Sequence, residues 1–166
     1  ASDVYKRQVP IIAYNYGAGH KDRVIKTIKH SVAYGVGIMF AGLLAMHIFP
    51  AQLMRMFDAE ESLIAIGAPA LETISLSFVF AGFCIVAGSV FQALGNGVYS
   101  MIVSVARQMC VLLPVAKLLS LSGEVTLIWW AFPIAELASV LLTSYFLVRI
   151  YRKVICHIGE PVVQDA

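Results

Sequence analysis

The chain has 166 residues, of which 60% are hydrophobic and 13% are charged, and its formal net charge is +2. Soluble domains average about 45–50% apolar and about 25% charged residues, so these values exclude an ordinary soluble domain. The small, scattered charge also excludes a nucleic-acid-binding protein. The mean hydropathy of +0.82 comes from long apolar blocks, which predict an all-α integral membrane protein embedded in a lipid bilayer.

The first residues differ in character from those that follow. Residues 1–8 (ASDVYKRQ) lack the pattern of a signal peptide, and we interpret them as a junction or non-native segment. Residues 9–16 are apolar but too short to cross a bilayer, and they overlap the run NYGAG at 15–19. Because Asn and Gly commonly close helices, we expect 9–16 to be the end of a spanning helix. A phosphate-binding nest at 15–19 is the alternative.

Four later segments are long and apolar enough to span a bilayer, which takes about 20 apolar residues. We place them at residues 31–50, 68–94, 100–121 and 125–151. The first is rich in small residues that would let other helices approach closely, namely Gly35, Gly37, Ala41, Gly42 and Ala45. The second begins near Pro69, a residue suited to a first helical turn, with Glu72 at the interface. Together with the helix end, the spans form one helical membrane region at 9–155.

The basic residues of the connecting segments predict the orientation. Residues 20–30 carry four Lys or Arg and form a predicted basic loop, whereas residues 51–62 carry one and residues 122–124 carry none. The end of the chain carries three, counted from Arg149. Since basic loops lie on the cytoplasmic side, we expect a cytoplasmic C-terminus, with 156–166 as a cytoplasmic tail.

Glu136 is the most informative single residue. It follows Pro133 within the last span and lies roughly 16 Å along the helix from Val125, at ~1.5 Å per residue. An ionisable group at mid-membrane costs at least ~2.5 kcal/mol, so it faces a cavity or a partner. Glu136 is either an ion-coupling carboxylate or a structural acid paired with Arg107, and the residues alone leave both open.

Arg107 and Gln108 lie inside the third span, where Pro114 would free a backbone carbonyl. The two could bind an anionic group or brace the bundle, and bracing is favoured because a membrane-embedded arginine needs partners. Cys84, Cys110 and Cys156 have no paired spacing and are interpreted as packing residues. No nucleophile–base, metal-ligand or cofactor pattern occurs, so the sequence predicts no enzyme, metal or cofactor.

Four motifs together resemble a known family. VPIIAYNYGAGHKDRV at 9–24 is similar to the signature at the cytoplasmic end of the eighth helix of multidrug and toxic compound extrusion (MATE) transporters, members of the MOP superfamily. FQALGN at 91–96, ARQMCVLLP at 106–114 and WWAFPIAELAS at 129–139 resemble the tenth-helix end, the eleventh and the twelfth helix. The motif and structural residues are Pro10, Asn15, Gly17, Gly19, Arg23, Gln92, Gly95 and Pro114.

The resemblance implies a fragment of a twelve-helix, two-lobe antiporter in a bacterial inner membrane. Four complete spans and the end of a fifth would belong to its second lobe, and the N-terminal lobe would be the missing partner. The family exchanges Na⁺ or H⁺ for organic cations, which implies a cavity at Glu136, Arg107, Gln108 and Pro133 in multidrug efflux. Many relatives carry aspartate where this chain has Glu136, so the reach of that carboxylate differs.

Two other functions are compatible with the sequence. A lipid-linked oligosaccharide flippase of the same superfamily would need a more basic cavity than Arg107 alone provides. A non-transporting membrane subunit could be built from the same close-packed helices.

Overall fold

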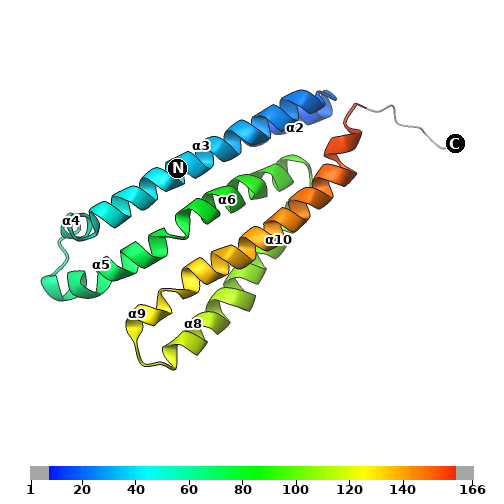
Figure 1. The fold of residues 1–166 in the computed structure, drawn as a ribbon. Coiled ribbons are helices and arrows are strands. Elements are labelled where there is room, and N and C mark those ends of the chain that lie inside the picture. Colours follow the sequence, from blue (N-terminus) through cyan, green and yellow to red (C-terminus); the bar gives the residue numbers. More distant parts are fainter. Residues whose placement is uncertain (1–7, 160–166) are drawn as a thin grey trace.

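In the computed structural model, which describes residues 8–159, every regular element is helical. Figure 1 shows long helices running side by side, with α6 between α3 and α10. The predicted all-α fold class is therefore confirmed. Most of the predicted junction and tail, residues 1–7 and 160–166, lies outside the described residues. The elements are α2 (Gln8–Gly17), α3 (Lys21–Ile48), α4 (Pro50–Arg55), α5 (Glu61–Ser75), α6 (Phe78–Ala93), α7 (Gly97–Val105), the π-helical η1 (Ala106–Leu112), α8 (Leu113–Ser120), α9 (Val125–Ile128), α10 (Ala131–Lys153) and the 3₁₀ helix η2 (Ile155–His157).

Three helical stretches of the described chain are long and apolar enough to cross a membrane, namely Lys21–Ile48, Gly97–Ser120 and Val125–His157. The bent pair α5 and α6 makes a fourth if it counts as one span. These stretches overlap the four segments predicted as spans. Their boundaries differ in three places, each for a local reason.

The first difference concerns the predicted basic loop. Residues 21–30 form the opening turns of α3, which is continuous over 28 residues. At ~1.5 Å per residue α3 is ~42 Å long, whereas the hydrocarbon core is ~30 Å thick. The charged turns can therefore extend beyond the apolar layer without breaking the helix. At the other end α3 stops at Ile48, and Pro50 opens α4 instead of closing the span.

The second difference is a break in the predicted span 68–94. Helix α5 begins at Glu61, so Pro69 lies inside it and Glu72 near its end. Helices α5 and α6 meet at an angle of 52°. At the break the Ser75 and Ser77 hydroxyls donate hydrogen bonds to the carbonyls of Glu72 and Ile74, at 2.9 and 2.6 Å. Such bonds from serine to the preceding turn compete with helix continuation and bend helices.

The third difference lies in the last two spans. The stretch 97–120 is π-helical from Ala106 to Leu112, directly before Pro114. Proline has no N–H for the carbonyl one turn back, and the Leu113 N–H bonds the Gln108 carbonyl in the wider π pattern. The last stretch is interrupted after α9 by a turn at Trp129 and Trp130. It also continues through Lys153, beyond the predicted end at 151.

The hydrophobic core lies at one end of the bundle, where α2, the start of α3, the end of α6 and the end of α10 meet. Its largest fully buried side chains include Ile12, Val24, Phe91 and Ile150. Tyr99 stacks on Phe146 of α10, with ring centroids 4.5 Å apart. The Lys21 ammonium donates a hydrogen bond of 2.8 Å to the Cys156 carbonyl, which ties the start of α3 to η2. This end is the one predicted to be cytoplasmic.

Much of the remaining surface is apolar. In an apolar stretch of 18 residues within Lys21–Ile48, only 11% is buried within the described chain. In the corresponding stretch of Gly97–Ser120 the buried share is 6%. Large side chains such as Tyr34, Phe40, Met101 and Leu141 are exposed. Contiguous apolar surface of this extent marks contact with a membrane or with another protein segment.

Helices α3 and α6 approach closely at a pair of glycines. A Cβ atom at Gly82 would lie 2.9 Å from the Met39 Cγ atom and 3.1 Å from the carbonyl oxygen of the buried Gly35. The backbone oxygen cannot move aside as a flexible side chain can. Of the small residues predicted to allow close approach, Gly35 therefore takes part, whereas Gly37 faces open space.

Replacing Gly82 by valine should separate α3 from α6. We expect Gly82→Val to destabilise the folded protein by about 1–3 kcal/mol, the usual range for an overpacked interior. Denaturant titration of the protein in detergent micelles measures the loss. Gly37→Val is the matched control, since it places the same β-branched residue at an open position of α3. Equal losses in the two variants would contradict the close contact.

Candidate functional site

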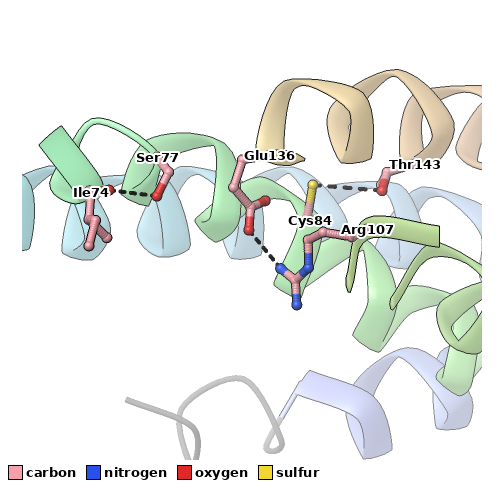
Figure 2. Close-up of polar contacts among 6 residues, drawn as sticks. All are labelled: Ile74, Ser77, Cys84, Arg107, Glu136 and Thr143. Atoms are coloured by element: carbon pink, nitrogen blue, oxygen red, sulfur yellow. Dashed lines mark hydrogen bonds and ion pairs between the residues drawn. The ribbon is translucent and has the colours of Figure 1, made fainter. Parts of the chain in front are cut away.

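An ion pair joins two of the spans in the interior of the helix bundle. The Arg107 Nη1 atom of η1 donates a hydrogen bond of 2.7 Å to the Glu136 Oε1 atom of α10. Figure 2 shows the two side chains pointing toward one another. The side chain of Glu136 is 11% exposed and that of Arg107 is 34% exposed. The carboxylate is therefore enclosed, and the guanidinium is the more accessible end of the pair.

The position of Glu136 follows from the pattern of α10. The buried residues Glu136, Ser139, Thr143, Phe146 and Ile150 recur every three or four positions, the spacing of one helix face. That face packs on α6 and η1. Along these five positions the face changes from polar at Glu136, Ser139 and Thr143 to apolar at Phe146 and Ile150. An acid on the inner face of a packed helix must find its partner within the bundle, and Arg107 provides it.

The second carboxylate oxygen of Glu136 lacks such a partner. Among the described residues neither Glu136 Oε2 nor the Ser139 hydroxyl, less than one turn further along α10, has a hydrogen-bond partner, although both atoms are buried. An unpaired buried oxygen costs free energy unless it binds a proton, a cation or water. The pair thus leaves one buried acceptor position at Glu136, and the hydroxyl of Ser139 on the same helix face is also unpaired among the described residues.

The polar face of α10 continues toward the core. The Thr143 hydroxyl donates to the Cys84 sulfur of α6 at 3.7 Å, and both residues are buried (Figure 2). Cys84 therefore packs inside the bundle as predicted, whereas Cys110 is exposed and Cys156 is intermediate. Within residues 8–159 no group of His, Cys, Asp or Glu is arranged to hold a metal ion.

A pocket of about 310 Å³ lies between α6, the α7–η1 stretch and α10. Arg107 contributes to its wall, but Glu136 does not. Within this wall the Gln92 amide nitrogen donates a hydrogen bond of 3.4 Å to the Ser100 hydroxyl oxygen. The polar lining residues are Ser89, Gln92, Ser100, Ser104, Arg107 and Thr143.

The other predicted cavity residues lie apart from the ion pair. Gln108 follows Arg107 in η1, but its side chain is exposed and does not line the pocket. Pro133 is buried in the first turn of α10, before Glu136. Of the four predicted cavity residues, the structure thus brings Arg107 and Glu136 together and places Gln108 elsewhere.

The predicted motif residues occupy helix ends and turns. Gly19 and Gly95 have φ values of +73° and +75°, which non-glycine residues rarely adopt, in the turns after α2 and α6. Asn15 donates a hydrogen bond of 2.8 Å to the Ile11 carbonyl, so its amide is used within α2. This geometry favours a helix-end turn over a phosphate nest. Pro10, Gly17, Arg23 and Pro114 are exposed, and Gln92 is the one motif residue in the pocket wall.

Sequence reasoning missed Ser104, Ser139 and Thr143. Ser139 and Thr143 stand three and seven positions after Glu136, so the helical spacing alone could have placed them on its face. Ser104 lies three positions before Arg107 and could have been found in the same way. The contact of Thr143 with Cys84 could not be found in this way, because it depends on the packing of α10 on α6.

Comparison with known proteins identifies similar molecules. The MatE family model matches residues 9–118, more than half of the chain, including Arg107 but not Glu136. The fold is similar to that of a solved structure described as an inward-facing conformation of a multidrug resistance MATE family transporter of the MOP superfamily, with a TM-score of 0.77 and 15% identity. The alignment covers 90% of this chain and 36% of that one. No curated protein matches.

Removing one member of the ion pair should cost more than removing both. Arg107→Met leaves the Glu136 carboxylate buried without a counter-ion, a loss of about 3–5 kcal/mol for such pairs. Adding Glu136→Gln removes the uncompensated charge and should recover most of that stability. Denaturant titration in detergent micelles measures both variants.

The exposed pair of Arg55 and Glu61 provides the control. Its atoms are 3.1 Å apart, and the side chains are 60% and 80% exposed. Arg55→Met should therefore cost no more than about 1 kcal/mol. If Arg107→Met is no more costly than Arg55→Met, the inner pair does not stabilise the bundle.

Proposed function

Because the chain belongs to the MatE family of membrane transporters, we propose that it forms part of a secondary active antiporter that exchanges Na⁺ or H⁺ for organic cationic compounds. The chain spans about a third of the length of the transporter that it resembles in fold, 36%. The proposal therefore concerns the whole transporter, in which this chain supplies most of the second lobe. A missing first lobe would cover part of the exposed apolar surface.

One observation carries the ion-coupling part of the proposal. Glu136 has one oxygen bonded to Arg107 and one buried oxygen that has no hydrogen-bond partner among the described residues. Carboxylates at this depth in transporters serve as proton or ion sites. A proton or a Na⁺ ion on the free oxygen would weaken the attraction between Glu136 and Arg107. Occupancy by the coupling ion is thereby linked to the contact between η1 and α10.

Two structural features provide places where that link could act. The π-helical segment η1 carries Arg107, and π-helical turns inside α-helices recur at functional sites. The break between α5 and α6 lies in the helix that packs on both α3 and α10. Broken helices line the cavities of many secondary transporters.

The flippase alternative needs positive charge for a pyrophosphate group. Arg107 is the one basic residue deep within the described spans, and a single guanidinium does not balance the several negative charges of a pyrophosphate group. That arrangement favours the antiporter. We further propose a bacterial inner-membrane location with a cytoplasmic C-terminus, which rests on the distribution of basic residues.

Glu136→Gln in the whole transporter should abolish most ion-driven efflux. The amide has the shape of the acid but no negative charge and no titratable proton, so imposing or removing the ion gradient should no longer change the rate of efflux. Efflux of a fluorescent organic cation from proteoliposomes, with and without an imposed Na⁺ or H⁺ gradient, measures the coupling. Loss of at least tenfold in the gradient-dependent rate is expected.

Glu61→Gln is the control, because Glu61 lies at the exposed start of α5 and takes no part in the ion pair of Arg107 and Glu136. It should transport at the normal rate. Unchanged, gradient-dependent efflux by Glu136→Gln would reduce Glu136 to a structural partner of Arg107. No efflux by the unaltered protein with any cation would favour a non-transporting role.

A further inference from the structure

Among the described residues, the pocket between α6, η1 and α10 is lined by a positively charged side chain and by no negatively charged one. Arg107 lines it, and among its lining residues, all within the described chain, there is no carboxylate. Glu136 lies behind the guanidinium and is enclosed by the bundle. Of the two members of the ion pair, only the basic one lines the pocket. An organic cation placed there would meet the guanidinium first.

The rest of the polar wall consists of groups that can donate hydrogen bonds. Hydroxyls come from Ser89, Ser100, Ser104 and Thr143, and an amide comes from Gln92. Arginine has five N–H donors, of which one is bonded to Glu136, so further donors are available for a ligand. Guanidinium and hydroxyl donors around one cavity suit a carboxylate or another anionic acceptor.

We propose that this pocket is a subsite for a carboxylate, or a similar anionic acceptor group, on a small organic ligand. At about 310 Å³ it is at the lower end of ligand pockets, which begin near ~300 Å³. It therefore holds a group the size of a benzoate ring, with Ile85, Phe91 and Val103 as its apolar contacts. The inference rests on the proposed function and deepens it: transported compounds carry an acceptor group that binds at Arg107 as well as a cationic group that binds elsewhere.

Three probes of one size separate the charge preference from simple fit. Benzoate, benzamide and benzylammonium share a ring and differ in charge. Isothermal titration calorimetry of the whole purified transporter, without any ion gradient, measures their affinities. We expect benzoate to bind at least tenfold more tightly than benzamide, and benzylammonium to show no binding at this site. Equal affinities, or tighter binding of benzylammonium, would overturn the proposal.

Three variants locate the binding, one of them a control. Ser104→Phe places a ring in the pocket from an exposed position of α7, and Val105→Phe places the same ring on the next, also exposed, residue, which does not line the pocket. Ser104→Phe should lower benzoate affinity at least tenfold, and Val105→Phe should leave it unchanged. The double variant Arg107→Gln with Glu136→Gln removes the charge without leaving a buried acid unpaired, and it should also lose at least tenfold.

The possible failures are distinguishable from failure of the proposed function. Absence of benzoate binding to the unaltered transporter, which follows if another part of the transporter fills the pocket, overturns the subsite but not ion-driven efflux. Benzoate binding that survives both Ser104→Phe and the double variant also overturns it, since the anion then binds elsewhere. Benzoate binding with the expected losses supports the subsite even where no cation is transported.

Discussion

The inner structure depends on the ion pair of Arg107 and Glu136, because neither charge can be left unpaired away from water. The pair joins η1 to α10 at 2.7 Å, between helices that otherwise meet through apolar and hydroxyl side chains. Its two ends differ in surroundings. The carboxylate is enclosed and has one buried oxygen without a hydrogen-bond partner among the described residues, whereas the guanidinium forms part of a pocket wall. The proposed coupling-ion site thus lies at the carboxylate of this pair, and the proposed anion subsite lies at its guanidinium.

Local irregularities in the helices set the place where this pair forms. Pro114 withholds a backbone N–H, and the chain before it widens into the π-helical η1 that carries Arg107. Ser75 and Ser77 bond to preceding carbonyls and interrupt the long apolar span between α5 and α6. The glycine contact at Gly82 brings α3 onto α6 and so holds α6 against the pocket. These irregularities lie in, or are packed on, the helices that form the ion pair and the pocket. In a transporter these are the helices that would have to shift.

Much of the fold could be predicted because its signals are local. Apolar length gave the four spans, and the turns at Gly19 and Gly95 followed from residues that tolerate positive φ. The helix boundaries were less predictable. Residues 21–30 look like a loop by charge, yet a long helix can carry charged turns beyond the apolar layer. Pro69 looks like a helix start, yet α5 accommodates it internally, and only the serine bonds reveal the true break.

The sequence by itself determined that this is a helical membrane protein with an acid and a base inside its apolar spans, since hydrophobicity and charge act residue by residue. Whether Glu136 and Arg107 meet was left open, because they are 29 positions apart and their contact depends on how η1 and α10 pack. The tertiary structure joined them, turned Gln108 outward and placed Arg107 rather than Glu136 in the pocket wall. The direction in which a charge faces is a property of packed helices, and no single helix encodes it.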